Sequence, residues 1–437
     1  MSEHGTSEVS TMAEPGGTGA HEGPVVLIGY AGGVLPSLGK FLPDGSVIFV
    51  EEPDVVRKRD VRSLAAGSPT LREVIEWEYQ LDGAADAFYL AHPDLRPSAV
   101  MPISEYGVPF AARIAERYGV LGTGYGAALA LRDKALLRTI TAAAGIPNPR
   151  SVEVSSPAEV RALMAELGTV VLKPANRQGA LGTRILSDPA DVDAAWAACT
   201  QQDEGVFVPD RGLPLRMLVE RYLRGDEYSV EMWFHEGEPR FAAPTRKYLF
   251  DGPTPVEQGH LHPADVSPEL YRRLIDDTTR VLTAIGMGSG FVHCEWIVED
   301  GVPYLVECAG RMAGDGIIEL VMMAWQHDIV EQFYTAMRGG GLGTAPPAPD
   351  RWAAAWMAHA PAGEVESVDG VEEAKAVPGV HTCVATVGVG AQVHELRSSW
   401  DRVAMVTAEG ATADEALGNA RQAIDHIVVK VRPTDPS

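Results

Sequence analysis

Short apolar runs recur along this chain and alternate with longer amphipathic segments. The apolar runs predict strands, and the amphipathic segments predict helices. The expected strands lie at residues 25–30, 46–50, 99–103, 169–172, 291–298, 303–308, 352–359, 381–387 and 402–409, with two more around residues 220 and 227. One helix is expected to end near residue 118, and four others are expected to span residues 129–144, 155–167, 317–338 and 412–427. This alternation indicates an α/β or α+β fold.

The two strands on either side of residue 300 each carry a glutamate among apolar residues, Glu295 and Glu307. If the loop between the strands has three residues, 300–302, the two side chains lie opposite each other on one face. Their Cβ atoms would then be about 5 Å apart. A two-residue turn at Asp300-Gly301 would instead put Glu307 on the other face of the hairpin.

Two facing carboxylates repel each other and are costly to bury, so such a pair indicates a positive charge between them. Mg²⁺ takes oxygen ligands and is often held by one or two carboxylates together with substrate phosphates. The alternative is that one glutamate faces solvent while the other pairs with Arg311. The hairpin therefore favours a metal site at Glu295 and Glu307 and leaves the alternative open.

A second candidate site begins at Lys173, which closes an expected strand and precedes a loop of small residues, 175–183. Backbone N–H groups of such a loop can approach phosphate oxygens, and the lysine ammonium adds a point charge. No Gly-Lys-Ser or Gly-Lys-Thr sequence closes the loop, so it is not a Walker-type P-loop. A flexible glycine loop beside a surface lysine would have the same sequence, and both interpretations stay open here.

Two glutamates seven residues apart follow, Glu220 at the end of one strand and Glu227 at the start of the next. A carboxylate in the connection can accept a hydrogen bond from an adenine amino group, and a second can bind two ribose hydroxyls. Backbone groups between them can contact the adenine edge. The alternative is that both glutamates are ordinary strand ends that face solvent.

Composition limits the classes of function. The 437 residues carry 36 Lys and Arg against 60 Asp and Glu, a formal charge of −24, so binding to nucleic acid or to anionic membranes is not expected. The four cysteines lack the CxxC spacing of a metal site and are expected to be buried and reduced. With no signal peptide and no long apolar run recognised, a cytoplasmic location is the expectation.

The N-terminal region and the domain boundaries are read from composition. Residues 1–23 are expected to form a disordered leader, and residues 24–125 an α/β domain. The strand, glycine turn, helix and strand ending at Glu51 is typical of some nucleotide-binding folds, but the full GxGxxG motif is absent. A plain βαβ unit is therefore favoured there. Residues 350–437 are expected to form a small C-terminal α+β domain, whose strands could also serve a homodimer face.

Taken in order, Lys134, Lys173 with its glycine loop, the two glutamates seven apart and the two hairpin glutamates resemble the motifs of the ATP-grasp superfamily of carboxylate–amine ligases. The resemblance implies a three-lobed fold, with the ATP-grasp domain at residues 126–349 and a lid subdomain at about 151–222. It implies ATP and Mg²⁺ as cofactors, with Mn²⁺ as an alternative metal. The implied nucleotide-binding residues are Lys134, Lys173, Gln178, Gly179, Ala180, Gly182, Glu220, Tyr222, Leu223 and Glu227, and the implied metal ligands are Glu295 and Glu307.

Within the superfamily the sequence looks most like the L-amino-acid ligases that make dipeptides. By that resemblance Glu257, His260, Arg311 and Gly314 line the amino-acid pocket, and Arg311 and Lys173 are the catalytic residues. A carboxylate suits an ammonium, and an arginine suits a carboxylate or acyl phosphate. One departure stands out, because the family usually has asparagine where this chain has Ala309, which cannot bind a metal.

The resemblance implies that a substrate carboxylate takes the γ-phosphoryl group of ATP to form an acyl phosphate, which an amine then attacks. The partners would be small molecules, the acid and the amine. Alternatives are another ATP-grasp acid–amine ligase or carboxylase, and a nucleotide-binding protein without turnover, for which Ala309 is the sequence support.

Overall fold

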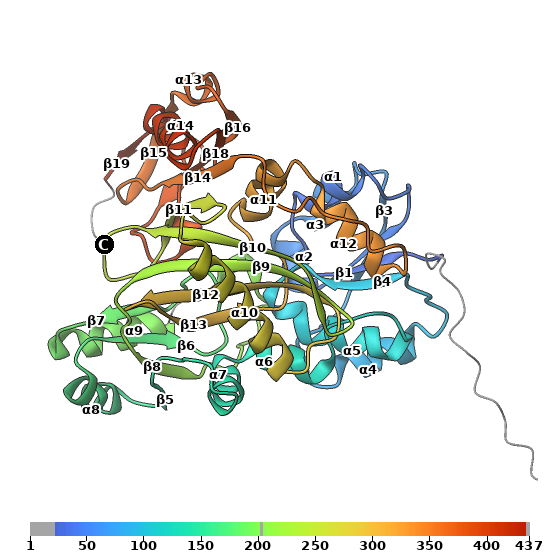
Figure 1. Ribbon diagram of the computed structural model, residues 1–437, viewed down its shortest axis with the longest axis horizontal. Coiled ribbons are helices and arrows are strands. Elements are labelled where there is room, and N and C mark those ends of the chain that lie inside the picture. Colours follow the sequence, from blue (N-terminus) through green and yellow to red (C-terminus); the bar gives the residue numbers. More distant parts are fainter. Residues whose placement is uncertain (1–21, 202–203, 434–437) are drawn as a thin grey trace, which may run out of the picture.

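The computed structural model describes residues 22–201 and 204–433, so the expected leader lies almost wholly outside the described residues. Figure 1 shows an N-terminal α/β unit in blue, a smaller sheet in green, and a large sheet that runs through the centre of the molecule to the C-terminal elements in red. This mixed α/β architecture is the one that the alternating pattern predicts.

The N-terminal unit is a parallel sheet in the order β3-β2-β1-β4. Its strands are β1 (Val25–Ile28), β2 (Val47–Glu51), β3 (Leu71–Glu76) and β4 (Ala99–Pro102). Its helices are α1 (Val34–Leu38), α2 (Pro53–Lys58), α3 (Val61–Ala65), α4 (Ala84–Ala91) and α5 (Val108–Tyr118), and the 3₁₀ helix η1 is Glu105–Gly107. β1 and β2 are buried along their whole length, as apolar runs in a parallel sheet should be. The carboxyl ends of the strands meet at one edge, next to a cavity described below.

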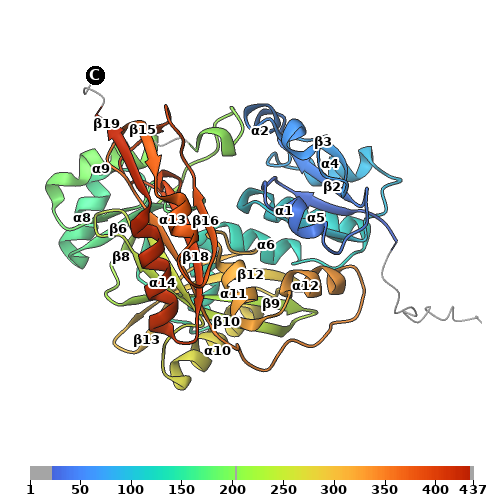
Figure 2. The same cartoon turned by 90° about the horizontal axis from the view of Figure 1, so that it is seen from above.

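A second sheet is antiparallel, in the order β5-β8-β6-β7, and we call it the lid sheet. Its strands are β5 (Ser151–Val154), β6 (Val170–Pro174), β7 (Arg184–Leu186) and β8 (Met217–Arg221), and its helices are α8 (Pro157–Leu167) and α9 (Val192–Gln201), with the 3₁₀ helices η2 (Pro189–Asp191) and η3 (Gly205–Phe207). Figure 2 shows the segment after α9 reaching across to α2 of the N-terminal unit. There Asp210 forms ion pairs of 2.6 Å with Arg57 and with Lys58.

The largest sheet has eight strands in the order β13-β12-β9-β10-β11-β14-β18-β16. They are β9 (Asp226–His235), β10 (Glu238–Leu249), β11 (Glu257–His262), β12 (Gly290–Glu299), β13 (Val302–Ala309), β14 (Trp352–Ala358), β16 (Val380–Ala385) and β18 (Ala404–Gly410). Helix α10 (Pro268–Ala284) packs on the core formed by β9 and β12. Three C-terminal strands, β14, β16 and β18, therefore extend the central sheet.

The remaining C-terminal elements form a smaller layer beside β14 and β18. They are β15 (Gly363–Asp369), α13 (Val371–Lys375), β17 (Gln392–Val393), η4 (Ser399–Asp401), α14 (Ala413–His426) and β19 (Val428–Arg432). Strands β17, β15 and β19 form a three-stranded sheet. The sequence pattern identified β14, β16, β18 and α14 but missed this edge sheet, whose strands are short and half-exposed.

Two long helices expected from the sequence are each two shorter helices. The one expected over residues 129–144 breaks at Asp133, which ends α6 (Tyr125–Arg132) and caps α7 (Lys134–Ala143). Its carboxylate accepts hydrogen bonds from the N–H groups of Ala135 (2.9 Å) and Leu136 (3.1 Å). Lys134 is therefore the first residue of a helix and not part of its interior.

The helix expected over residues 317–338 breaks in the same way between α11 (Ile317–Trp325) and α12 (Ile329–Met337). Gln326 adopts a left-handed conformation with φ 49°, and Asp328 accepts a hydrogen bond from the N–H of Glu331 at 2.9 Å. An aspartate that caps a helix is a readable signal, and at both breaks the apolar periodicity concealed it.

Candidate active site

A single large cavity of about 1040 Å³ lies between the N-terminal sheet, the lid sheet and the eight-stranded sheet. Most of the site residues expected from the sequence line it, and these come from α7, the lid region, the eight-stranded sheet and the segment after β13. They are Lys134, Lys173, Gln178, Gly179, Ala180, Glu220, Tyr222, Leu223, Glu227, Glu257, His260, Glu295, Glu307, Arg311 and Gly314. The lining does not include Gly182, where a Cβ would come within 3.0 Å of Pro174 and of the Cys199 carbonyl oxygen. That glycine is needed for packing and for its φ of 70°.

Glu295 and Glu307 are direct cross-strand partners in the hairpin of β12 and β13. The connection is the two-residue turn, in which Asp300 (φ 52°) and Gly301 (φ 75°) are both left-handed. The register set by this turn would place the two carboxylates on opposite faces. A bulge that leaves Val306 unpaired shifts the register by one residue and brings them opposite each other. The loop length alone does not predict this bulge, so the sequence left the facing of the two glutamates open.

The first group of charges, which we call the basic end, comprises Lys134, Arg138, Lys173, Glu220 and Glu307. Glu220 is buried and forms ion pairs with Lys173 (2.6 Å) and Arg138 (2.9 Å). Burial alone would raise the pKa of Glu220, but Arg138 and Lys173 together lower it to about 2. Lys134 pairs with Glu307 at 3.0 Å. Three cationic side chains thus face two carboxylates.

Arg138 was not identified from the sequence. It lies four residues after Lys134, one turn along α7, and its guanidinium also donates to the Val306 carbonyl oxygen at 2.6 Å. That spacing is the signal that could have revealed it. Since both oxygens of Glu220 accept from cations, the carboxylate holds Lys173 in place on the wall of the cavity.

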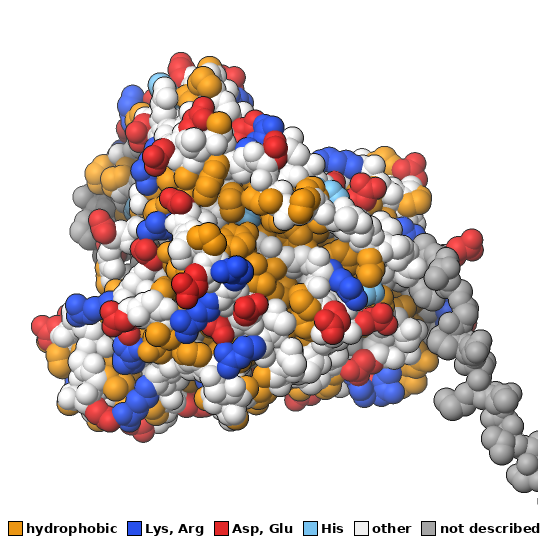
Figure 3. Space-filling view, in the orientation of Figure 1, with side chains coloured by type: hydrophobic (Ala, Val, Ile, Leu, Met, Phe, Trp, Pro, Cys, Tyr) orange, Lys and Arg blue, Asp and Glu red, His pale blue; other side chains and the backbone are white. Residues whose placement is uncertain are grey.

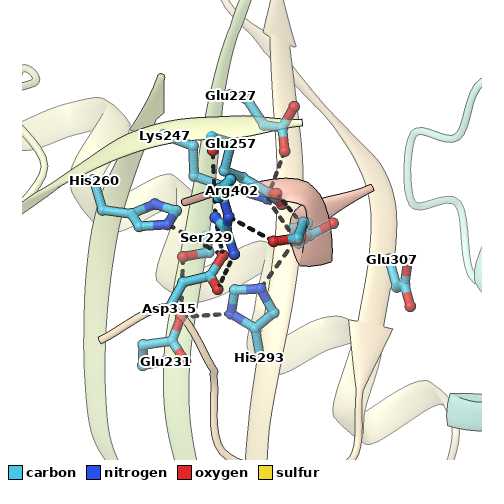
Figure 4. A network of polar contacts seen from close by, with 12 residues as sticks. Glu227, Ser229, Glu231, Lys247, Glu257, His260, His293, Glu307, Asp315 and Arg402 are labelled. Atoms are coloured by element: carbon cyan, nitrogen blue, oxygen red, sulfur yellow. Dashed lines mark hydrogen bonds and ion pairs between the residues drawn. The ribbon is translucent and has the colours of Figure 1, made fainter. Parts of the chain in front are cut away.

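The second group, which we call the acidic end, is centred on the buried Lys247 of β10. Its ammonium lies 2.7 Å from Glu227, 3.1 Å from Glu257 and 2.6 Å from Glu295. Figure 4 shows Glu227 and Glu257 beside Lys247, with Glu307 apart from them. Burial would lower the pKa of Lys247, but the surrounding carboxylates raise it well above its usual value. The lysine is therefore a permanent cation in this network.

His293 extends the acidic end along β12. Its Nδ1 lies 2.7 Å from Glu231 and its Nε2 lies 3.0 Å from Glu295. Although burial opposes the charge, these two carboxylates raise the pKa of His293 to about 10, so its ring is an imidazolium at neutral pH. Glu231 also accepts a hydrogen bond from Ser229 at 2.9 Å. Polar residues at every second position of apolar strands are the signal for this network, which the sequence analysis did not use.

The acidic end continues to Asp315 and His260. Arg402 of the C-terminal region binds Asp315 with two hydrogen bonds, of 2.6 and 2.9 Å. Although burial raises it, the pKa of Asp315 lies far below its usual value, chiefly because of His260 and Arg402. His260 is fully buried, its Nε2 is 3.7 Å from Asp315, and neither ring nitrogen has a hydrogen-bond partner among the described residues. A buried imidazole with unmatched nitrogens on a cavity wall is suited to a ligand.

Arg311 also lines the cavity. Its Nε is 3.1 Å from the buried Glu105 of the N-terminal unit, and its Nη1 donates to the carbonyl oxygen of Met312 at 2.8 Å. Arg311 is therefore held by Glu105 and not by either hairpin glutamate, contrary to the alternative in which it pairs with one of them.

A divalent cation fits the hairpin only in part. Two carboxylates face one cavity, and Mg²⁺ needs no more than one or two from the protein when phosphates supply the rest. Ala309 adds no donor, and no three acidic, histidine or cysteine side chains converge on a metal position within residues 22–201 and 204–433. Each carboxylate is at present neutralised by a lysine, Glu307 by Lys134 and Glu295 by Lys247. A bound metal would have to share these carboxylates with the lysines or displace them.

Two family models match this chain. One describes an ATP-grasp domain and covers residues 168–319, and the other describes the L-amino acid ligase C-terminal domain 2 and covers residues 356–432. Residues 168–319 therefore match an ATP-grasp domain, and residues 356–432 match the C-terminal domain of the L-amino acid ligases, as the motif resemblance predicted.

Individual proteins agree with this assignment. The chain is 28% identical over 299 residues to an uncharacterised protein, y4rH, of Sinorhizobium fredii, covering 67% of this chain and 60% of that one. It is 23% identical over 235 residues to the alanine–anticapsin ligase of Bacillus subtilis, covering 50% of this chain and 49% of the ligase. The alignments thus span about half to three fifths of these relatives.

Among solved structures, the L-amino acid ligase of Bacillus licheniformis superposes with a TM-score of 0.76 at 18% identity, covering 94% of this chain and 99% of that one. This likeness confirms the expected ATP-grasp fold. In the part of the chain that the structure describes, no helix is both long and apolar enough to cross a bilayer.

Proposed function

We propose that this member of the ATP-grasp superfamily is an ATP-dependent, ADP-forming ligase that joins the carboxylate of an amino acid to an amine. One observation carries the proposal, the opposite excess of charge at the two ends of one cavity. The basic end sets three cationic side chains against two carboxylates. The acidic end sets five carboxylates (Glu227, Glu231, Glu257, Glu295 and Asp315) against three cationic side chains (Lys247, His293 and Arg402).

The basic end suits a nucleotide triphosphate. Lys173 and Lys134 offer ammonium groups, and Gln178, Gly179 and Ala180 form the loop that borders the same space. Tyr222 and Leu223 are assigned to the adenine edge through their backbone groups, as in the superfamily motif. Glu220 is assigned a supporting part, because its carboxylate is occupied by Lys173 and Arg138.

Glu227 and the hairpin carboxylates complete the nucleotide half. Glu227 is assigned to the ribose, with its carboxylate shared with Lys247. Glu295 and Glu307 are the proposed ligands of Mg²⁺ or Mn²⁺. With the nucleotide bound, the metal neutralises phosphate charge, and ATP supplies the phosphoryl group that activates the substrate carboxylate.

The acidic end suits the ammonium group of an amino acid. Glu257 offers a carboxylate on the cavity wall, and His260 offers ring nitrogens that form no hydrogen bond with the described residues. Gly314 has no atom within 4 Å of a Cβ position, so it leaves room beside them. Excess negative charge in a largely buried pocket favours a cationic group over a neutral one.

We assign Arg311 to the reacting carboxyl group, because it lines the same cavity as Lys134, Lys173 and Glu257. Glu105 and the Met312 carbonyl oxygen hold its guanidinium, so little ordering remains when it binds an anion. We assign it the stabilisation of the phosphoryl group and then of the oxyanion. An acyl phosphate hydrolyses in water, so the glycine loop must exclude water during the reaction.

The test is phosphate release from ATP and Mg²⁺ with pooled amino acids, in a buffer free of bicarbonate. Release that depends on the amino acids is the expected result. Release that depends on bicarbonate instead would favour a carboxylase. Nucleotide binding without release under any acceptor would favour a protein that has lost turnover, for which Ala309 in place of a metal-binding residue is the one observation.

A further inference from the structure

A short segment of the C-terminal region, residues 398–402, contacts the cavity from outside the ATP-grasp domain match. Ser399 joins two parts of the site that are far apart in the sequence. Its N–H donates to the carbonyl oxygen of Gly179 in the glycine loop at 3.1 Å. Its hydroxyl donates to the carboxylate of Glu257 at 2.9 Å. One residue therefore touches both the loop expected to close over phosphates and the acid assigned to the substrate ammonium.

Trp400 lies against the same loop. A Cβ built on Gly179 would lie 3.7 Å from the Trp400 ring, so the ring covers the glycine directly. The ring also stacks on Phe207 of η3, with centroids 4.5 Å apart and planes at 18°. Phe207 in turn lies under the Arg59 guanidinium of the N-terminal unit, 4.9 Å from the ring centroid. Trp400 thus sits where the C-terminal region, the lid region and the glycine loop meet.

The segment is rigid enough to position these groups. Asp401 accepts hydrogen bonds from the N–H groups of Arg397 (3.0 Å) and Ser398 (2.9 Å), and the Ser398 hydroxyl caps the 3₁₀ turn. At the other terminus of the segment, Arg402 donates two hydrogen bonds to Asp315 of the acidic end. It also donates one to the Glu257 carbonyl oxygen at 3.3 Å. Fixed ends leave Ser399 and Trp400 little freedom, as a positioning device requires.

We propose that Ser399 and Trp400 form a latch that couples closure of the glycine loop to the amino-acid pocket at Glu257. The effect of this latch on the reaction rests on the proposed ligase function, whereas the contacts that form the latch do not depend on it. Trp400 and the Ser399 N–H hold the loop at Gly179, and the Ser399 hydroxyl orients the Glu257 carboxylate toward its substrate ammonium. The C-terminal domain of the L-amino acid ligase type thereby gains a role in the reaction, which is to keep water from the activated carboxyl group.

Two variants separate the two halves of the latch. Ser399→Ala removes the hydroxyl that contacts Glu257 but keeps the N–H that contacts Gly179. Trp400→Ala removes the ring that covers Gly179 but keeps both Ser399 contacts, and Trp400→Phe retains an aromatic ring for the stack on Phe207. Ser367→Ala is the matched control, because its hydroxyl donates to Asp369 on the exposed side of the same domain. Thermal melting of all four variants checks that each is folded.

The first measurement needs no turnover. Limited trypsin digestion, without ligands, reports the opening of the glycine loop through cleavage after Arg177, which lies within it. We expect Trp400→Ala to be cleaved about tenfold faster than wild type, Trp400→Phe to be close to wild type, and Ser399→Ala and the control to be unchanged. Equal cleavage rates for Trp400→Ala and wild type would overturn the latch, whatever the protein catalyses.

The second measurement uses the reaction. Trp400→Ala should release more phosphate than product, because water reaches the activated carboxyl group, while wild type stays near one to one. Ser399→Ala should raise the KM for the amino acid about tenfold with little change in the KM for ATP. If the variants keep wild-type values for both the phosphate-to-product ratio and the KM, the coupling is wrong. If wild type itself forms no product, the ligase proposal fails while the digestion still decides the latch.

Discussion

The two ends of the cavity are built from the same kinds of side chain in opposite proportion. At the basic end, Glu220 is surrounded by Lys173 and Arg138. At the acidic end, Lys247 is surrounded by Glu227, Glu257 and Glu295. At the basic end, one carboxylate therefore positions two cations. At the acidic end, one cation positions three carboxylates. The difference indicates that an anion is expected at the first and a cationic group at the second.

The two ends also sit on different scaffolds. The basic end draws on α7 and on strands of the lid sheet, so it joins elements of different parts of the fold. The acidic end is built mostly on β9, β10, β11 and β12, which are neighbours in one sheet, and Asp315 and Arg402 reach it from outside those strands. Figure 3 shows acidic and basic side chains interspersed on one outer face of the molecule, so on that face no single sign of charge dominates. The separation of charge is a property of the cavity.

The largest effect is expected from removing the ammonium at the basic end. Lys173→Met should lower amino-acid-dependent phosphate release by about a thousandfold, since phosphoryl transfer depends on charge neutralisation. Lys430→Met, at an exposed ion pair on β19, is the matched control and should keep wild-type activity. Turnover of Lys173→Met near the wild-type rate would remove the basic end from the mechanism.

Removing Lys247, the central cation of the acidic end, should mainly lower the stability of the folded protein. Lys247→Met leaves three partly buried carboxylates without their shared partner, and the free energy of unfolding should fall by about 3 kcal/mol. Adding Glu257→Gln to that variant should recover part of the loss, because one of the unpaired charges is removed. A double variant less stable than Lys247→Met, by thermal or urea unfolding, would contradict this account of the network.

Glu257→Gln alone should act on substrate binding. We expect the KM for the amino acid to rise about 10- to 100-fold, the value of a hydrogen bond to a charged group, while nucleotide affinity stays the same. Steady-state kinetics with each substrate varied in turn will measure both. An equal rise in the KM for ATP would show that the two ends are not separate sites.

The last prediction concerns a buried acid, Glu51. Burial raises the pKa of Glu51, on the N-terminal wall of the cavity, to about 7, whereas two cations lower the pKa of Glu220 to about 2. Between pH 4.5 and 7 the folded protein keeps the Glu51 proton and the unfolded chain loses it. Stability from this group is therefore full below pH 4.5 and declines as pH rises to 7, by at most about 1.4 kcal/mol per pH unit.

Glu51→Gln should remove that contribution. Unfolding free energies of wild type and variant, measured at intervals from pH 4.5 to 7.5, should converge or cross as pH rises, with the variant gaining relative to wild type. A constant difference across that range would show that Glu51 is ionised in the folded protein.

The sequence predicted most of what depends on neighbouring residues. The order of strands and helices, the paired hairpin glutamates and the lysine before the glycine loop all follow from local pattern. The capping aspartates Asp133 and Asp328 were also readable, but continuous apolar periodicity concealed the breaks they cause. Local pattern fails where a bulge decides a register, as at Val306.

The network at the acidic end could not be predicted in the same way. Lys247 and Glu295 are 48 residues apart, and their contact depends on the strand order of the eight-stranded sheet. Arg402 and Ser399 reach the cavity from another family domain altogether. Such pairings arise from tertiary packing, whereas the periodicity of a single sequence reports only local secondary structure.

The central claim is that one cavity binds a nucleotide at one end and an amino acid at the other so that they react. The most direct test is mass spectrometry of the products that form when the protein is incubated with ATP, Mg²⁺ and pairs of amino acids. The account predicts a condensation product that forms in step with ADP and phosphate for at least one pair. ADP and phosphate without any condensed product, or no consumption of ATP with every pair, would contradict it.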